Sequence, residues 1–401
     1  MIHNSAKAFT IVFAAALAMA ATLPGRTHGL GLITTRLLKE FPELSESGFA
    51  RVNLVATLIG SLVCLPCGWL IDRFGLRSIA ALVLGALGCV VLCMAGAPSV
   101  MVLCIAITLT RGIGQSMLSV VSLSIMGKSF PNRSGAVMGI YAVLLTFMMA
   151  AWTGLLGHRV SNLGWRIAWS EVGWGILILA PLVWFMLPNS RTVYVLSSGE
   201  PVVAEDRRSA TLGQALATPC FWAFALGIAL FGMISSGVSL FQQSILASKG
   251  FSEQLYHISL VVGLFVGMAA NLFGGWLATK FPLQRLLGVA LWLLAGSLLA
   301  LPYLSTPSHA YMFCIAYSFA GGLITVLFFT VWGQAFGTQE LAKIQGAAQM
   351  LTVLGSSVGP LLVTESNARF QSYDPILWLF AMASLLIGLF SFVIAVPQSR
   401  S

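Results

Sequence analysis

Two stretches of this sequence resemble each other, GWLIDRFGLR at residues 68–77 and GWLATKFPLQR at residues 275–285. Both follow the pattern G-W-L-x-x-[basic]-F-x-L, and their starting points are separated by about half of the 401-residue chain. Each follows the second hydrophobic run of its half. Because the match recurs at the same position in both halves, it indicates an internal duplication rather than chance similarity between hydrophobic segments.

The composition shows what kind of unit is duplicated. Hydrophobic residues make up 58% of the chain and charged residues only 8%, whereas a soluble domain carries about 25% charged residues. Such a chain is expected to be a polytopic membrane protein with the lipid bilayer as its surroundings. Its spans should be helices, because an open chain in lipid must satisfy its own backbone hydrogen bonds. The sequence therefore predicts an all-α membrane protein.

About twelve hydrophobic runs have the length needed to cross a bilayer. Their approximate limits are 9–35, 52–71, 78–96, 99–127, 135–157, 165–187, 219–247, 256–278, 286–303, 309–335, 344–364 and 375–396. The longest polar stretch between them is 188–218. We therefore expect a six-helix bundle over 1–187, a cytoplasmic linker over 188–218 and a second six-helix bundle over 219–401.

The basic residues predict the orientation of the chain. Apart from Arg26 and Arg111, which lie deep in predicted spans, they divide twelve to seven between the two sides of the membrane. The side of the N-terminus carries Lys7, Arg73, Arg77, Lys128, Arg133, Arg191, Arg207, Arg208, Lys280, Arg285, Lys343 and Arg400. Because cytoplasmic loops are richer in Lys and Arg, both termini are expected to be cytoplasmic, with the protein in the inner membrane. The net charge of +9 then reflects topology, and no nucleic-acid partner is expected.

Three motifs carry a resemblance to a known family. GWLIDRFGLR closely resembles the loop signature of the major facilitator superfamily, G-x-x-x-D-R-x-G-R, with Leu76 as one extra residue. TRGIGQ at 110–115 is similar to the second motif of that superfamily, and GSSVGP at 355–360 resembles its glycine–proline motif, although in the eleventh span. The resemblance covers the whole chain. It implies a transporter whose two six-helix bundles rock around a site near the membrane midplane.

Each residue of the first motif also has a physical interpretation. Gly68 and Gly75 have no side chain and permit close approach of a helix or loop. The resemblance implies that Asp72 caps the start of the eleventh helix in one conformation, where the helix N-terminus favours a carboxylate, and that Arg73 and Arg77 complete this cytoplasmic latch. The alternative is ordinary topogenic loop charge, which explains the arginines but neither the glycines nor the aspartate.

The stretch TLPGRTHGLG at residues 22–31 places Arg26 past the middle of the first span. Arg111 lies near the middle of the fourth span, and Gln115 follows one helical turn later on the same face. An arginine at the centre of a membrane helix costs about 2.5–3.5 kcal/mol on insertion scales. In the superfamily the first and fourth helices line the cavity of the N-terminal half. This implies that both arginines view one aqueous chamber, with His28 and Gln115 as further binding candidates.

The same residues have plainer interpretations. Arg111 can serve as a structural hydrogen-bond donor, Arg26 can extend towards the external face, and His28 can be satisfied by a neighbour. Acidic groups are scarce, since Glu171 in the sixth span is the one carboxylate within the predicted spans. Two cations in a cleft of low dielectric constant favour an anion, and Glu171 is the candidate coupling group.

A narrower resemblance concerns PGRTHGLGLITTRLLKEF at residues 24–41, which is similar in layout to the first helix of monocarboxylate and oxalate–formate porters. That branch has a basic residue in this helix, which matches Arg26. It also has an aspartate and an arginine one turn apart in the eighth helix, where this chain has Gly267 and Asn271. The resemblance implies a small organic anion as substrate, but the coupling pair of that branch is absent.

The second half offers uncharged polar candidates, namely Ser236 in the seventh span, Asn271 in the eighth and Gln349 in the eleventh. A buried polar group in lipid needs a partner, which a substrate or a neighbouring helix can equally supply. Cys64 and Cys67 form a CLPC stretch, which is interpreted as helix packing.

Together these features predict a secondary active transporter for a small-molecule substrate, an organic anion such as a monocarboxylate, that works by alternating access. One alternative is efflux of amphipathic drugs or lipids, favoured by 25 Phe, 11 Trp and 15 Met. Another is a non-transporting membrane sensor on the same scaffold. The sequence shows no P-loop and no metal-ligand cluster, so neither an enzyme nor a cofactor is expected. The direction of transport and the coupling ion, a proton or another ion, stay open.

Overall fold

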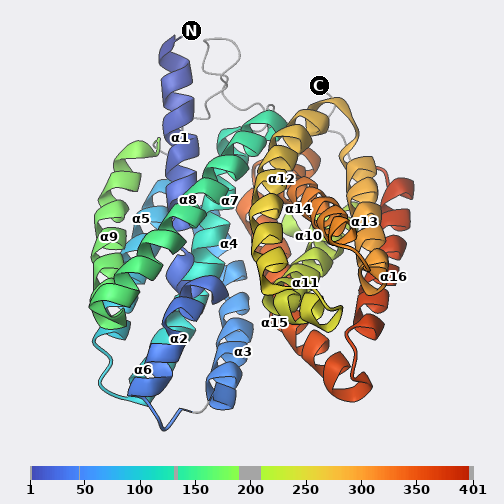
Figure 1. Ribbon diagram of the computed structural model, residues 1–401. Coiled ribbons are helices and arrows are strands. Elements are labelled where there is room, and N and C mark those ends of the chain that lie inside the picture. Colours follow the sequence, from blue (N-terminus) through green and yellow to red (C-terminus); the bar gives the residue numbers. More distant parts are fainter. Residues whose placement is uncertain (1, 45, 131–133, 189–208, 397–401) are drawn as a thin grey trace. The chain divides into compact units, whose positions relative to one another are not determined.

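The computed structural model describes residues 2–44, 46–130, 134–188 and 209–396, and these residues form helices and no strands (Figure 1). Twelve helical segments of the described chain are long and apolar enough to cross a membrane, which confirms the predicted all-α fold with twelve spans. These segments are Lys7–Gly25, Arg51–Phe74, Leu76–Ala95, Val100–Ser129, Val137–Leu163, Trp165–Met186, Pro219–Ser248, Gln254–Lys280, Leu283–Tyr303, Pro307–Phe336, Leu341–Phe370 and Asp374–Val393.

The chain divides into two compact units. The first combines Met1–Pro131, Leu144–Ser209 and Thr338–Met350. Its elements in chain order are α1 (Ile2–Ala20), η1 (Leu23–Gly25), α2 (Thr27–Glu40), α3 (Glu46–Leu62), α4 (Cys64–Phe74), α5 (Leu76–Ala95), α6 (Val100–Leu109), η2 (Thr110–Leu118), α7 (Ser119–Ser129), most of α8 (Ser134–Leu163), α9 (Trp165–Met186) and the start of α15 (Leu341–Phe370).

The second unit combines Asn132–Val143, Ala210–Gly337 and Leu351–Ser401. Besides the start of α8 and the rest of α15, it contains α10 (Leu212–Leu216), α11 (Pro219–Ser248), α12 (Glu253–Lys280), α13 (Leu283–Ala300), η3 (Leu301–Tyr303), α14 (Pro307–Phe336) and α16 (Asp374–Val393). Residues 189–208 of the predicted linker lie outside the described residues. The division into bundles over 1–187 and 219–401 stays a prediction.

Local sequence signals explain where several spans of the second unit begin. The hydroxyl groups of Thr218, Ser252 and Thr306 accept hydrogen bonds from backbone N–H groups in the first turns of α11, α12 and α14. In α11 and α14 the capping residue is followed by proline, Pro219 and Pro307, whose missing N–H is not needed at the first helical position. These caps satisfy donors that have no partner within the helix.

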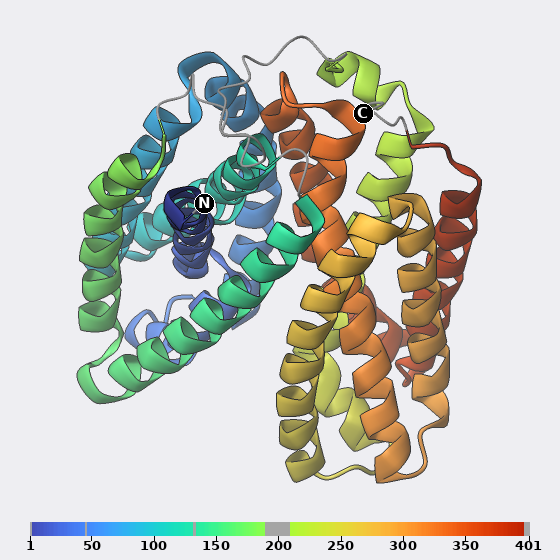
Figure 2. The same ribbon diagram turned by 90° about the horizontal axis from the view of Figure 1, so that it is seen from above.

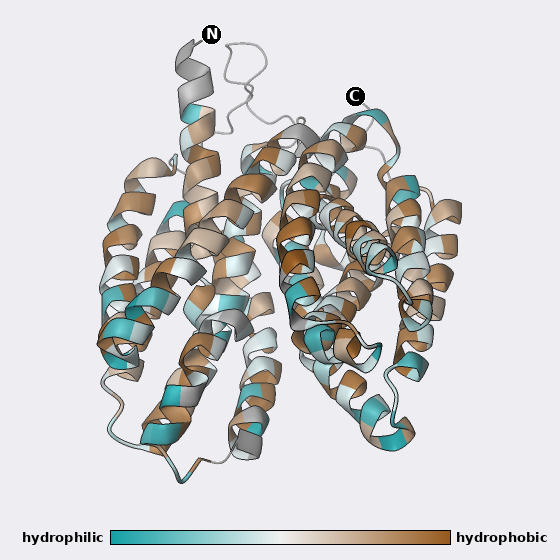
Figure 3. Ribbon diagram, in the orientation of Figure 1, coloured by the Kyte–Doolittle hydropathy of each residue, from teal (hydrophilic) through white to brown (hydrophobic). Residues whose placement is uncertain are grey.

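Hydropathy follows the expectation for helices in lipid. Figure 3 shows hydrophobic residues along the helices, with hydrophilic residues concentrated near helix ends and in loops. Large apolar side chains such as Phe185 and Val393 are exposed, at 78% and 82%, because in lipid an outward-facing apolar residue needs no protein cover. The first span is the most buried of the twelve. Figure 2 looks nearly along α1, which packs against α7 and α9.

A network of hydrogen bonds connects the ends of three helices of the first unit. Arg166 in α9 donates to Glu40 Oε1 at the end of α2 (2.6 Å) and to the carbonyl oxygens of Ala95 and Ala97 after α5 (2.6 and 2.8 Å). Trp165 Nε1 donates to the other oxygen of Glu40 (2.6 Å). Burial raises the pKa of Glu40, but the bonds from Arg166 and Trp165 outweigh it and bring the pKa below its usual value. Glu40 is therefore a charged anchor at this end.

Candidate functional site

The predicted first span, 9–35, is interrupted at Pro24 and Gly25 and is not one continuous helix. After α1 the chain passes through η1, a short 3₁₀ helix that contains Pro24, and Arg26 is extended, with φ −96° and ψ 155°. Proline removes a backbone donor and disfavours the helical conformation of the residue before it. α2 then starts a new helix at Thr27. Arg26 thus occupies the gap between two helices rather than the face of one helix.

The fourth span is also irregular at the facing position. Residues Thr110–Leu118 form the π-helix η2 between α6 and α7, a rare form that is frequent at functional sites. An added Cβ at Gly25 of η1 would lie 2.9 Å from the backbone nitrogen of Gln115 and 3.0 Å from the carbonyl carbon of Thr110. The two irregular segments therefore touch backbone to backbone, which only glycine permits at position 25.

Arg111 lies in η2 and is 2% exposed. Its Nε and Nη2 donate to Asn53 Oδ1 of α3 at 3.0 and 2.6 Å. Its Nη1 donates to Gln115 Oε1 (2.7 Å) and to Thr27 Oγ1 at the start of α2 (3.2 Å). All of these acceptors are neutral. The guanidinium is thus well oriented by hydrogen bonds, while its positive charge is retained in a buried place.

Arg26 bonds to residues of the first span and of α7. Its Nε donates to Thr22 Oγ1 (2.6 Å), and its Nη2 lies 3.3 Å from Ser119 Oγ and 3.2 Å from Met19 Sδ. The side chain therefore turns towards α1 and α7. Since Arg111 bonds Thr27, the next residue after Arg26, both arginines converge on the break in the first span.

The structure brings only some of the predicted binding residues together. Arg26, Arg111 and Gln115 meet in the first unit, and Gln349 lies buried in α15 of the same unit. His28 lies in α2, but its side chain is outside the described residues. Asn53, which accepts two bonds from Arg111, was not singled out from the sequence, because nothing local links it to a residue 58 positions away.

The uncharged candidates of the second half belong to the second unit. Ser236 in α11 donates to the carbonyl oxygen of Ser356 in α15 at 2.7 Å, so a neighbouring helix satisfies its hydroxyl. Asn271 in α12 is 5% exposed, and its Oδ1 has no hydrogen-bond partner among the described residues.

Glu171, the predicted coupling candidate, forms an ion pair with Arg159 of α8, in which both side chains are more than 40% exposed. Its role in coupling stays a prediction.

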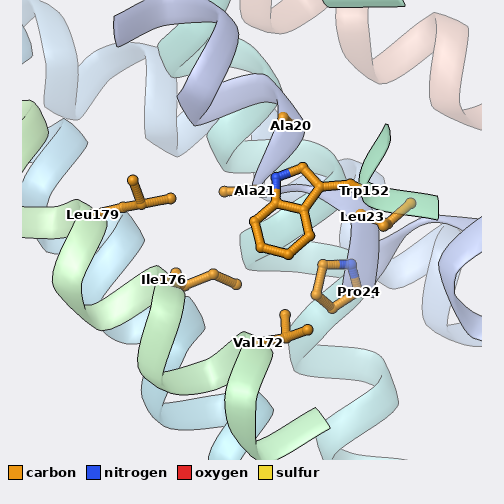
Figure 4. Close-up of a pocket in the computed structure, with 8 residues that line it drawn as sticks. All are labelled: Ala20, Ala21, Leu23, Pro24, Trp152, Val172, Ile176 and Leu179. Atoms are coloured by element: carbon orange, nitrogen blue, oxygen red, sulfur yellow. The ribbon is translucent and has the colours of Figure 1, made fainter. Parts of the chain in front are cut away.

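A small cavity lies beside the break in the first span (Figure 4). Pro24, Leu23 and Ala21 line it on one side, and Trp152, Val172 and other apolar side chains of α8 and α9 line it on the other. Its volume is about 20 Å³, which is room for roughly one water molecule. Its lining has no charged group. This cavity is thus too small and too apolar to hold an organic anion.

The motif residues lie at the contact between α4 and the start of α15. Asp72 Oδ2 accepts a hydrogen bond from the backbone N–H of Lys343 (3.2 Å), as the resemblance implied for a cap on the eleventh helix. Asp72 Oδ1 pairs with Lys128 Nζ of α7 at 2.7 Å. The backbone of Gly68 packs on Ala342 so closely that an added Cβ would lie 2.8 Å from the carbonyl carbon.

The two motif arginines contact aromatic rings, and their part in the latch stays a prediction. Arg73 lies over the rings of Trp69 and Phe74, and Arg77 lies over the ring of Trp184. Neither pairs with Asp72, and Lys128 provides the cation instead. Gly75 separates α4 from α5 with φ +87°, a conformation that favours glycine.

Comparisons with known proteins agree with this architecture. The family model described as Major Facilitator Superfamily matches residues 7–360. The human organic anion transporter MFSD10 (TETRAN) is similar in structure with a TM-score of 0.70 and 15% identity, over 96% of this chain and 99% of that chain. The proton:xylose symporter XylE bound to 6-bromo-6-deoxy-D-glucose is similar in structure with a TM-score of 0.74 and 17% identity, over 99% of this chain and 98% of that chain.

The E. coli fucose:proton symporter FucP gives a TM-score of 0.67 and 11% identity, over 98% of both chains. No curated protein sequence matches this chain significantly. At such low identities the solved structures establish only the fold. The family model describes the superfamily as a whole and does not distinguish its branches. The narrower resemblance to monocarboxylate porters therefore stays a prediction. The chain belongs to the Major Facilitator Superfamily, and it is an integral membrane transporter rather than an enzyme.

Proposed function

We propose that this chain is a secondary active transporter that moves a small organic anion, for example a monocarboxylate, by alternating access. The observation that carries the proposal is the convergence of Arg26 and Arg111 on the break in the first span. A buried cation is expensive in a membrane. The neutral acceptors around Arg111 fix its orientation but do not offset its charge. An anionic substrate would supply the compensating charge.

The break itself adds to the preference for an anion. α2 begins at Thr27 and has no side-chain cap, since its N-cap residue is Arg26. The first N–H groups of a helix have no partner within it and attract anions. Discontinuous helices whose N-termini serve anionic substrate groups are a recurring feature of transporters. The N-terminus of α2 and the two arginines therefore favour the same class of ligand, an anion.

The structural neighbours do not select a substrate by themselves. One neighbour is named as an organic anion transporter, and the other two are named as proton symporters of the sugars xylose and fucose. Sugars are neutral and would leave the charge of Arg111 uncompensated, so the anion is preferred here on electrostatic grounds. Amphipathic drugs or lipids are the second transport candidate, and a sensor role predicts ligand binding without movement of the ligand.

The test combines a ligand screen with two substitutions. Thermal shift of the purified protein against carboxylates, sugars and cationic drugs should show stabilisation by a carboxylate, because a ligand stabilises the state that it binds. Arg26→Gln should then weaken binding of that carboxylate by about tenfold, because hydrogen bonds to charged groups contribute about 1.5–3 kcal/mol against 0.5–1.5 for neutral ones. Arg26→Lys should retain part of the affinity, since it keeps the charge but loses the planar fork.

Arg36→Gln, which removes an equal charge from an exposed position of α2, is the matched control and should bind like the wild type. Counterflow in proteoliposomes then separates a transporter from a sensor. Unchanged carboxylate affinity in a well-folded Arg26→Gln protein, or stabilisation by sugars alone, would sink the organic-anion assignment.

A further inference from the structure

Arg73 and Arg77 lie at the junction of α4 and α5 and contact aromatic rings. Arg73 Cζ is 5.0 Å from the ring centroid of Trp69 and 5.5 Å from that of Phe74. Arg77 Cζ is 4.6 Å from the ring centroid of Trp184, near the end of α9. A ring face attracts a guanidinium but does not neutralise it. The rings therefore hold two full positive charges at one end of the first unit.

Neither arginine has a carboxylate partner among the described residues. Asp72, the acidic residue next to them in the motif, is occupied by Lys128 and by the N–H of Lys343. The Nε of Arg77 is buried and has no hydrogen-bond partner in the described part of the chain. Buried donors in native proteins are nearly always paired. An oriented guanidinium with an unused donor indicates a site for an acceptor that bears negative charge.

The surroundings of this site belong to the membrane interface. Trp69, Phe74 and Trp184 are 43%, 56% and 36% exposed. They lie at the ends of spans, and tryptophan is enriched at headgroup depth because its ring is apolar and its N–H is polar. The start of α5 and the end of α9 lie at the same end of the first unit (Figure 1). An acceptor that reaches this place from the bilayer is a lipid headgroup.

We propose that Arg73 and Arg77 bind the phosphate of an anionic phospholipid, with Trp69 and Trp184 beside its glycerol region. Guanidinium groups donate two parallel hydrogen bonds to phosphate. Gly75, the N-cap of α5, provides no side-chain cap, so the first N–H groups of that helix are further donors for an anion. Basic pockets between membrane helices recognise lipid headgroups in this way. This site is separate from the arginines of the proposed substrate site.

The test is lipid binding by the full-length protein. Delipidated protein in detergent is titrated with phosphatidylglycerol or phosphatidylcholine, and bound lipids are counted by native mass spectrometry. Wild type should bind phosphatidylglycerol more tightly. Arg73→Gln and Arg77→Gln should each weaken this binding roughly fivefold, the share of one basic residue near a membrane surface. The phosphatidylglycerol affinity of Arg77→Lys should lie between those of the wild type and Arg77→Gln, because lysine keeps the positive charge but lacks the planar guanidinium that donates two parallel hydrogen bonds.

A charge-matched control removes Arg36 and Lys39, both exposed in α2, as the double variant Arg36→Gln/Lys39→Gln. It should bind phosphatidylglycerol like the wild type. Glycerol phosphate is the soluble competitor and should not displace the lipid at equal concentration. Displacement would assign the site to a soluble phosphate instead. Unchanged lipid affinity in an Arg73→Gln variant that stays monodisperse in size-exclusion chromatography, or an equal loss in the control, would overturn the proposal.

Discussion

Arg111 illustrates how a single buried charge is held in a membrane helix. Asn53 Oδ1 accepts from two of its nitrogens, and Gln115 and Thr27 share a third. These neutral acceptors orient the side chain and satisfy its donors. They leave the charge available to an anion, which is why one residue can serve both structure and binding. Asn53 is the most important of them, because it receives two bonds.

The residue-scale prediction concerns this acceptor. Asn53→Leu should lower the free energy of unfolding by about 1–3 kcal/mol, because two N–H groups of a buried guanidinium lose their partner. The measurement is thermal unfolding in detergent. Asn162→Leu, which removes an amide bonded to His158 at the exposed end of α8, is the control and should change the melting temperature little. Equal melting temperatures for the two variants would show that water replaces Asn53 without loss.

The contact between α4 and the start of α15 depends on small residues from both sides. An added Cβ at Gly68 would lie 2.8 Å from Lys343 Cα, and one at Gly346 would lie 2.7 Å from the carbonyl oxygen of Cys64. Asp72 caps the start of α15 at the same contact. We propose that this contact acts as a latch that opens during transport. On the α4 side, the backbone of Cys64 contributes to this contact, since its carbonyl oxygen faces Gly346.

The element-scale prediction uses two buried thiols of α4, the helix that carries Gly68 and Asp72. Cys64 and Cys67 are 0% exposed, and Cys67 Sγ donates to the carbonyl oxygen of Met117 in η2. Both should react with a maleimide only when α4 loses its packing against the neighbouring helices. Gly68→Ala should speed their alkylation because its methyl group has no space. Asp72→Asn should do so by about fivefold, because the hydrogen bonds that Lys128 and the N–H of Lys343 make to Asp72 become weaker by about 1 kcal/mol when the acceptor is neutral. Labelling is followed by mass spectrometry, with Cys89, Cys93 and Cys104 replaced by serine to remove more accessible thiols.

Two controls match these substitutions. Gly85→Ala adds a methyl group where nothing lies within 4 Å. Thr279→Ala alters the position of the second repeat that corresponds to Asp72, where the hydroxyl bonds back to its own helix at Trp276. Both should alkylate at the rate of the wild type. If Asp72→Asn and Thr279→Ala behave alike, the charged loop serves membrane topology and not a latch.

At the scale of the whole molecule, the repeat noted in the sequence has a structural counterpart. α4 ends at Phe74 and α5 begins at Leu76, while α12 ends at Lys280 and α13 begins at Leu283. Both copies of the motif therefore cover the end of the second span of their half, the short connection after it and the start of the third span. With twelve spans, the two ends of the chain are expected on the same side of the membrane.

The whole-molecule prediction is the orientation, with both termini cytoplasmic in the inner membrane. Ser198→Cys, in the predicted linker, should react with an impermeant maleimide only after the cells are opened. Ser305→Cys, exposed before α14, should react in intact cells. The physical reason is the excess of Lys and Arg on the linker side. Labelling of Ser198→Cys in intact cells would contradict this topology.

The sequence by itself determined the class of protein, the twelve spans and the superfamily. These features depend on local properties, since about 20 consecutive apolar residues cross a bilayer and the lipid leaves helices as the available form for them. The motif at 68–77 could also be identified from the sequence alone. Its glycines allow close packing and Asp72 caps a helix, and these roles fix the spacing between the residues. The cap on α15 at Lys343 was implied by the family resemblance and lies where expected.

Only the tertiary structure decided the details on which the proposed site depends. The hydrophobic periodicity of the fourth span does not reveal the π-helix η2. A π-helix widens the turn by one residue and rotates the side chains that follow, but the polarity of the residues in the sequence stays the same. The partners of Arg111 and of Asp72 are 58 and 56 positions away in Asn53 and Lys128. Which acceptor meets which donor is set by how helices pack, and a polar residue in a span shows only that it needs a partner, not which one.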